Sequence, residues 1–222
     1  MQFYQKWTAA RFDNEGKVEY ESFSADVPGN IQYDFALKNN FGDIQYSDNV
    51  NKFKELEDYW WVYRSNLHFD KKSDETVWFV AEGIDYIFDI KIDGELLYSS
   101  EGMFSKSELD ITDKAKNGSL LEVIIHPHPK RAGADECRDQ ADQSCKPPFC
   151  YGWDWNPRLI VSGIWRNAFI ETRNSDYISY CEPFYALNET RDIAEVEFKT
   201  QAEKVVTYTL CDQENNIIYK GT

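Results

Sequence analysis

The stretch that decides the fold is TVWFVAEGIDYIFDIKIDGELLYSS, residues 76–100. It predicts a strand, a break at Glu82-Gly83, a second strand, a turn at Asp93-Gly94 and a third strand. An Asp-Gly pair between two apolar runs is typical of a two-residue β-hairpin, because both turn positions need a positive φ. We therefore expect antiparallel sheet structure in this part of the chain.

The segments around this stretch have the same character. WWVYRSNLHF, residues 60–69, alternates with the period of two that a half-buried strand requires. NGSLLEVIIHPHP, residues 117–129, predicts a strand that its two prolines end, and NAFIET, residues 167–172, predicts another. IQYDFALKN, residues 31–39, predicts a short helix. In this first strand the alternation places Trp61, Tyr63, Ser65, Leu67 and Phe69 on one face, and Val62, Arg64, Asn66 and His68 on the other.

Short strands separated by turn signals predict an all-β protein with an antiparallel sandwich or jelly roll. Residues 1–174 would form this first domain. Beyond it, the segments ISYCEPFYAL, AEVEFKT, VVTYTLCD and NIIYKG predict further strands. These are fewer than the roughly seven strands of an immunoglobulin-like sandwich. We therefore expect residues 175–222 to be the incomplete start of a second domain of that class.

Charge restricts the partners of the chain. Its 222 residues include 39 acidic and 24 basic side chains, for a net charge of −15, with no basic cluster. Nucleic acid and anionic membranes would be repelled, whereas a neutral carbohydrate would not. The sequence has no apolar run of about eighteen residues, and its amino terminus lacks the apolar core of a signal peptide. We expect a soluble chain, which would be periplasmic or extracellular if a signal peptide has been removed.

Cysteine and histidine do not predict a metal centre. Cys137, Cys145 and Cys150 lie close together, so a disulfide within this cluster and a set of reduced thiols are both open. Their spacing does not match a zinc site. His126 and His128 would share one face of a strand, but no third ligand is evident, so a solvated strand end is favoured. We expect neither a metal nor a cofactor.

A tryptophan-rich segment, CYGWDWNPRLIVSGIW at residues 150–165, is not needed by a plain sandwich. The polar segment ahead of it, residues 131–151, has almost no apolar periodicity. A polar segment of about twenty residues in a compact domain is usually functional or disordered. From the residues alone, the tryptophan-rich segment is either a packed turn or a functional loop. Trp165 is expected in the core.

Five segments together resemble the amino-terminal domain of glycoside hydrolase family two, and they occur in that family's order. The resemblance runs from Trp7 to Thr172, and the last segment looks like the β-mannosidase branch. It implies a galactose-binding-like jelly roll, an immunoglobulin-like sandwich and a TIM barrel that holds two catalytic glutamates. A barrel needs about 250 residues, so we expect it to lie outside this chain. The segments are VPGNIQYDF, YWWVYRSNLHF, VAEGIDYIFDIKIDG, GMFSKSELDIT and GWDWNPRLIVSGIWRNAFIE.

The resemblance also implies roles for individual residues. Asp154 would accept hydrogen bonds from sugar hydroxyls, and Trp153 would wall the sugar pocket. Arg138 would take the place of a family arginine that points into the same pocket. Arg158 and Trp155 would brace the loop from behind, as an ion-pair or stacking partner and as a core aromatic. No acidic residue lies in the sequence context that the family uses for its acid/base, so no catalytic residue is assigned.

Three classes of function follow. The first is the non-catalytic front end of a retaining exo-β-mannosidase, whose partners are a terminal β-linked sugar and the TIM barrel of the same chain. Within it, a β-galactosidase, β-glucuronidase or exo-β-glucosaminidase of the same family is the alternative. The second is a free-standing carbohydrate-binding module. The third is a structural sandwich, which an exposed apolar patch around Trp60 and Trp61 would support.

Overall fold

The computed structural model describes residues 1–13, 17, 19–141 and 144–222. They divide into two units. Unit 1 is Met1–Lys71 with Val77–Thr172, and unit 2 is Lys72–Thr76 with Arg173–Thr222.

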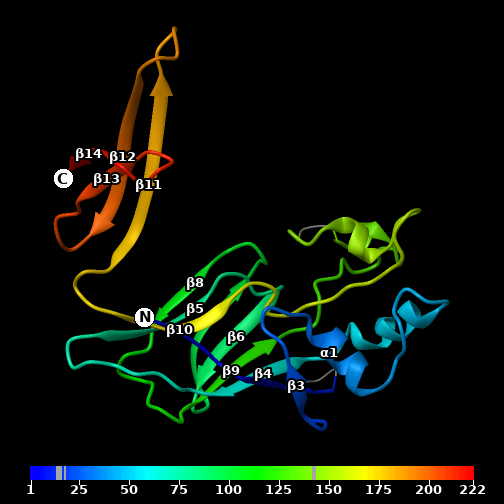
Figure 1. The fold of residues 1–222 in the computed structure, drawn as a ribbon. Helices are drawn as coiled ribbons and strands as arrows, with labels where there is room; N and C mark the ends of the chain where they lie inside the picture. The colour runs from blue at the N-terminus through cyan, green and yellow to red at the C-terminus, as the bar shows by residue number, and fades with distance from the viewer. Residues whose placement is uncertain (14–16, 18, 142–143) are drawn as a thin grey trace. The chain divides into compact units, whose positions relative to one another are not determined.

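Unit 1 is built on a six-stranded antiparallel sheet with the order β3-β2-β4-β9-β6-β7 (Figure 1). The predicted hairpin is confirmed, since β6 and β7 flank a turn in which φ is 50° at Asp93 and 84° at Gly94. Both values lie in the left-handed region that this turn needs. The strands are β2 (Trp7–Arg11), β3 (Phe23–Ala25), β4 (Trp61–Asn66), β6 (Ile87–Ile92), β7 (Glu95–Glu101) and β9 (Leu120–Ile125).

A four-stranded sheet forms the second layer, with the order β1-β10-β5-β8. Apolar side chains from both sheets meet in one core cluster, in which Phe79 and Ile90 are fully buried. The all-β sandwich that the sequence predicts is therefore confirmed. Its strands are β1 (Gln2–Tyr4), β5 (Thr76–Ala81), β8 (Ser107–Asp110) and β10 (Ala168–Arg173).

The inner face of β4 is aromatic and lies deep in the core. The five residues that the alternation places on one face, Trp61, Tyr63, Ser65, Leu67 and Phe69, are all buried. Trp61 is 1% exposed and packs edge-on against Phe23 and Phe35, at ring-centroid distances of 6.4 and 5.5 Å. The hypothesis of an exposed apolar patch around Trp60 and Trp61 is therefore wrong, because strand alternation turns Trp61 into the core.

One short helix, α1 (Ile31–Lys38), follows β3, as the sequence predicts. Its N-cap is Asn30, whose side chain accepts a hydrogen bond from the Tyr33 amide, the usual way to satisfy a free helix N–H. The Ile31 amide donates to the Ser162 carbonyl at 3.0 Å, which ties the helix to the end of the tryptophan-rich segment. A 3₁₀ segment, η1 (Asn49–Leu56), comes next and buries Phe53 and Leu56.

Unit 2 consists of two antiparallel strand pairs. β11 (Ile178–Leu187) pairs with β12 (Ala194–Ala202), and β13 (Tyr208–Cys211) pairs with β14 (Ile217–Gly221). The two pairs touch through Phe198 and Tyr208, whose rings stack at 4.4 Å. The four strands predicted after Arg173 are therefore present.

The alternatives left open for the cysteines can now be compared with the structure. All five cysteines lie in the described part of the chain, and each is a free thiol. Of the two alternatives left open for Cys137, Cys145 and Cys150, the structure has the free thiols. Among the described residues, no helix has both the length and the apolar character needed to cross a membrane.

The buried carboxyl of Asp34 predicts a pH dependence of stability. Burial raises the pKa of Asp34 to about 6, and the Asp26 amide donates to this carboxyl at 3.1 Å. Since the folded pKa exceeds the unfolded one, the folded chain binds the extra proton, and the free energy of unfolding falls as the pH rises from about 4 to 6. Asp34→Asn removes this titration and keeps an acceptor oxygen.

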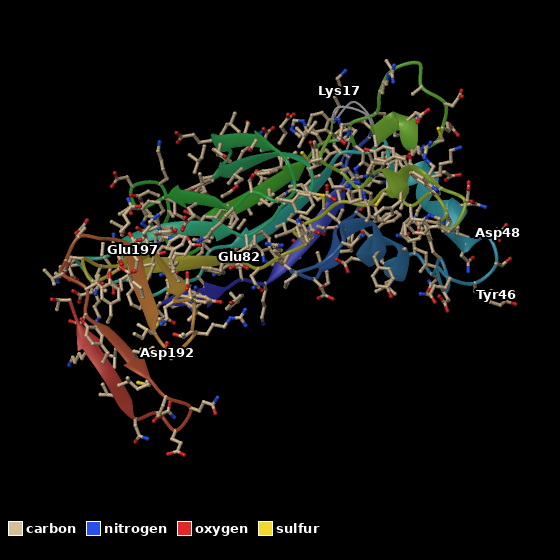
Figure 2. All side chains as sticks on the ribbon, turned by 90° about the horizontal axis from the view of Figure 1, so that it is seen from above. Lys17, Tyr46, Asp48, Glu82, Asp192 and Glu197 are labelled. Carbon is tan, nitrogen blue, oxygen red and sulfur yellow. The ribbon has the colours of Figure 1, made fainter. Side chains whose placement is uncertain are left out.

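We expect Asp34→Asn to gain about 1–3 kcal/mol of stability on the wild type between pH 4 and pH 7, measured by urea unfolding at several pH values. The matched control is Asp48→Asn, at an exposed carboxylate (Figure 2). Parallel pH profiles for Asp34→Asn and the wild type would contradict the assignment.

Candidate functional site

The tryptophan-rich segment forms a tight turn at one end of the sandwich. Two 3₁₀ turns precede it, η2 (Arg138–Ala141) and η3 (Pro148–Tyr151). The amides of Trp153 and Asn156 each donate to the other's carbonyl, at 2.9 and 3.3 Å. The Asn156 side chain then donates to the carbonyls of Phe149 and Pro157, at 3.1 and 3.0 Å. The segment lies in the yellow-green part of the chain in Figure 1, at the same end of the sheets as α1.

The structure brings together the three residues that sequence reasoning singled out. Arg138, Trp153 and Asp154 line one open hollow of about 500 Å³. The Arg138 guanidinium lies 4.2 Å above the centre of the Trp153 ring, within cation–π range. Trp153 is 40% exposed, and Asp154 is exposed as well. A neighbouring hollow of about 540 Å³ lies beside the same Arg138–Trp153 pair.

The side chains that line this hollow are of the kinds that bind a ligand by hydrogen bonds and aromatic packing. It offers a carboxylate that accepts hydrogen bonds, a guanidinium that donates them and an indole face. Such a set suits a polyhydroxylated neutral ligand, whose hydroxyls donate and accept and whose C–H faces pack on aromatic rings. Among the described residues, no group of three or more His, Cys, Asp or Glu side chains is placed to hold a metal ion.

Arg158 braces the base of the loop, as the family resemblance implies. Its Nε and Nη2 atoms donate to the two carboxylate oxygens of Glu57, at 2.8 and 2.7 Å. Its Nη1 donates to the Tyr151 carbonyl at 3.1 Å. Glu57 is buried, so this bidentate ion pair is largely removed from water. Removing one partner of a buried pair typically costs about 3–5 kcal/mol, because the other charge is left uncompensated.

The interpretation of Trp155 as a core aromatic is wrong. Trp155 is 69% exposed, because the turn at residues 153–156 directs it outward, and it contacts Phe149 at 5.5 Å between ring centroids. Trp165, also expected in the core, is half-buried at the edge of the sandwich. Its indole N–H donates to the Met103 carbonyl at 2.7 Å. A Cβ on Gly83 would lie 2.8 Å from the same indole nitrogen, so only glycine fits there.

The two histidines have different surroundings. His126 Nε2 lies 2.9 Å from Asp89 Oδ2, and its ring lies 4.0 Å from that of Trp60. His128 is buried and lies 3.5 Å from the Gln32 amide nitrogen, so the expectation of a solvated strand end is wrong for it. Burial, with nearby Lys146 and Lys130, holds the pKa of His128 well below its usual range. His128 is therefore a neutral core residue.

Sequence reasoning missed a second buried ion pair, between Lys146 and Asp85. Lys146 is 3% exposed, and its Nζ donates to both carboxylate oxygens of Asp85, at 2.7 Å for Oδ1. It also donates to the Val161 carbonyl at 2.8 Å. Asp85 in turn exchanges two backbone hydrogen bonds with Gly163, of 2.9 and 3.2 Å. A lysine followed by two prolines in a polar segment gives no signal of burial.

A small apolar cluster lies beneath the loop and is separate from the main core. It contains Ala141, Tyr151 and Ile160, with Cys150 partly buried against it. The Tyr151 hydroxyl donates to the Pro129 carbonyl at 2.7 Å. This bond joins the loop to the connection that follows β9.

The fold and the site together define a galactose-binding-like sandwich that presents an aromatic and carboxylate loop. Residues 7–166 match the model of the "Glycosyl hydrolase 2 galactose-binding domain-like" family. The chain belongs to this family.

Two relatives are much longer than the region in which they match this chain. The β-mannosidase of Bos taurus is 25% identical over 176 residues, which cover 70% of this chain and 20% of that protein. β-Mannosidase B of Aspergillus clavatus is 27% identical over 165 residues, which cover 65% of this chain and 19% of that protein. The matched region thus spans about a fifth of the length of these relatives.

Solved structures share the fold. The β-D-mannosidase of Dictyoglomus thermophilum superposes with a TM-score of 0.78 at 19% identity, over 100% of this chain and 28% of that one. The β-D-glucuronidase of the same organism gives 0.61 at 16% identity, over 99% and 36%. The exo-chitosanase CsxA of Amycolatopsis orientalis gives 0.60 at 17% identity, over 93% and 25%. At these identities the likeness establishes the fold.

The Tyr151 hydroxyl provides a test of the loop's attachment. We expect Tyr151→Phe to lower the free energy of unfolding of unit 1 by about 1 kcal/mol, because the Pro129 carbonyl loses its donor. Tyr46→Phe, at a position that is 73% exposed, is the matched control and should change nothing. Urea unfolding followed by tryptophan fluorescence measures both. Equal midpoints for the two variants would show that the bond does not hold the loop.

Proposed function

We propose that this chain is the non-catalytic amino-terminal part of a family 2 glycoside hydrolase, an exo-β-mannosidase that hydrolyses terminal β-mannosides with retention. The family match and relatives named β-mannosidase support this proposal. The observation that carries it is the single hollow lined by Arg138, Trp153 and Asp154. These residues would form one wall of a sugar pocket, and a catalytic barrel would supply the rest.

The chemistry would be divided between the two parts. A retaining glycosidase needs two carboxyl groups about 5–5.5 Å apart, one to attack the anomeric carbon and one to protonate the leaving oxygen. We assign both to the barrel. Asp154 would accept hydrogen bonds from sugar hydroxyls, Arg138 would donate them and Trp153 would pack against the ring. A sugar with a displaced hydroxyl leaves the Asp154 carboxylate unpaired, at a cost of about 1–3 kcal/mol.

The alternative within the same family is a β-galactosidase, a β-glucuronidase or an exo-β-glucosaminidase. A β-D-glucuronidase and CsxA, which is also named an exo-β-D-glucosaminidase, have the same fold, so the fold does not discriminate between these sugars. A free-standing carbohydrate-binding module is less well supported, because the hollow is open and would form only one wall of a sugar pocket. We expect the chain alone to bind sugar very weakly.

Asp154 gives the direct test of this function. In the full-length parent enzyme, we expect aryl β-mannoside to be preferred over aryl β-galactoside, β-glucuronide and β-glucosaminide. Asp154→Ala should lower kcat/KM on the mannoside about a hundredfold, equivalent to about 2.7 kcal/mol of transition-state stabilisation, because hydroxyl acceptors are lost. The matched control is Asp48→Ala, which removes an exposed carboxylate that does not line the hollow (Figure 2). If Asp154→Ala is as active as Asp48→Ala, the turn is only a packed turn.

We further propose that residues 1–174 form the sugar-binding sandwich and that residues 175–222 are the first strands of an immunoglobulin-like sandwich. The register of β11 and β12 supports this division, because it places apolar residues on one face. Tyr185 lies opposite Val196 on that face, beside Leu187, and these side chains are 75%, 43% and 52% exposed. Further strands of the parent would cover this face.

Val196→Lys tests whether that face becomes covered. In the 222-residue chain we expect no measurable change in the unfolding of unit 2, because the position is open to solvent. In the full-length parent we expect a loss of about 2 kcal/mol or more, because the charge would be buried without a partner. The control is Glu197→Gln at a position labelled in Figure 2, which strand alternation places on the opposite face of β12, and it should be neutral in both. Equal effects of Val196→Lys in the two proteins would exclude a covering sheet.

A further inference from the structure

We propose that two buried ion pairs, Asp85–Lys146 and Glu57–Arg158, are positioning pairs that hold the two ends of residues 146–158 and so set where Trp153 and Asp154 stand. This inference rests on the proposed function for its catalytic consequence. Its structural part, the immobilisation of the turn, stands on the contacts alone.

The first pair fixes the start of the segment. All three N–H donors of Lys146 Nζ are used, two on the Asp85 carboxylate and one on the Val161 carbonyl. Asp85 is itself fixed, since its backbone N–H and C=O bond to Gly163. The neighbours of this pair form a second link, because the Cys145 amide donates to the Tyr86 hydroxyl at 2.8 Å. The loop is thereby joined to the two residues before β6 through one side chain of its own, Lys146, and through the side chains of Asp85 and Tyr86.

The second pair fixes the end of the segment. The guanidinium of Arg158 is planar, so its two parallel bonds to Glu57 define its orientation as well as its position. Lys130 Nζ lies 2.9 Å from the same Glu57 carboxylate, which adds a second cation to balance it. The third Arg158 bond, to the Tyr151 carbonyl, reaches the residue directly before Gly152. The turn that carries Trp153 therefore starts from a fixed backbone.

Apolar packing alone would not hold this loop. The cluster beneath it has three buried side chains, and Trp153, Asp154 and Trp155 at the tip are all exposed. Directional charge-assisted bonds therefore supply the constraint that a larger core supplies elsewhere in the sandwich. A shift of the segment at either end would move Asp154 relative to Arg138, which lies in η2, ahead of Lys146 in the chain.

Hydrogen exchange measures the structural part. In the 222-residue chain, we expect Lys146→Met and Arg158→Met to speed amide exchange in residues 149–156 at least tenfold, with β4 and β9 unchanged. Lys114→Met is the matched control, because Lys114 pairs with Glu95 at 2.6 Å where both side chains are about half exposed. The double variant Asp85→Asn with Lys146→Met covers the case in which a lone buried charge prevents folding, since removing both charges is often tolerated. Unchanged exchange in residues 149–156 of the single and double variants would overturn the inference.

Sugar discrimination measures the functional part. In the full-length parent, a displaced loop should reduce the preference for aryl β-mannoside over aryl β-galactoside at least fivefold, whereas simple loss of folded enzyme lowers both rates equally. We expect this loss of preference in the double variant and in Arg158→Met, and not in Lys114→Met. If Asp154→Ala impairs the enzyme while these variants keep the wild-type preference, the inference is wrong and the proposed function stands. If Asp154→Ala has no effect but exchange is faster, the proposed function is wrong and the pairs still hold the loop.

Discussion

Strand alternation on β4 is the constraint on which the rest of the structure depends. β4 pairs with β2 on one side and β9 on the other, so it lies inside the six-stranded sheet. Its period of two sends Trp61 and Tyr63 into the core, where Tyr63 meets Trp7 edge-on at 6.1 Å and Trp61 meets aromatic rings from β3 and α1. These contacts place α1 against the sheet. At the start of α1, the Ile31 amide donates a hydrogen bond to the Ser162 carbonyl. The end of the tryptophan-rich segment is therefore positioned by α1, which itself packs against the aromatic side chains of β4.

The loop beyond β9 follows a different rule from the sandwich that supports it. The sandwich is held together by buried apolar side chains, whereas the loop is attached through buried ion pairs. Glu57 and Asp85 are both buried, and each has a cation from the loop as its partner. Buried ion pairs contribute little net stability, because desolvation offsets the attraction, but they are intolerant of displacement. The ion pairs therefore fix the position of the loop while adding little to the free energy of unfolding. This suits a loop whose tip must stay exposed to solvent.

The parts of the fold that sequence reasoning predicted are those with a local cause. The hairpin at Asp93-Gly94, the alternation of β4 and the short helix α1 each depend on residues within a few positions of one another. The parts that it missed are the Asp85–Lys146 pair and the identity of Glu57 as the partner of Arg158, and both depend on residues far apart in the chain. Asp85 and Lys146 are separated by 61 positions, and Glu57 and Arg158 by 101. The sugar-binding roles of Trp153 and Asp154 came from resemblance, and they remain proposals. The outward direction of Trp155 depends on the bonds of a turn that composition does not encode.

The stacking of Arg138 on Trp153 has a consequence for the influence of ionic strength. The chain carries a net charge of −15, yet the hollow combines one guanidinium with the carboxylates of Asp139 and Asp154. A neutral glycoside entering it exchanges hydrogen bonds with no change in net charge, so added salt has little to screen. An acidic sugar would instead be attracted by the Arg138 guanidinium and repelled by the negative net charge of the chain. Salt screens both interactions and would therefore change the affinity for such a sugar. Arg138 therefore gives a predominantly acidic surface a local site at which neutral and anionic sugars differ in their response to salt.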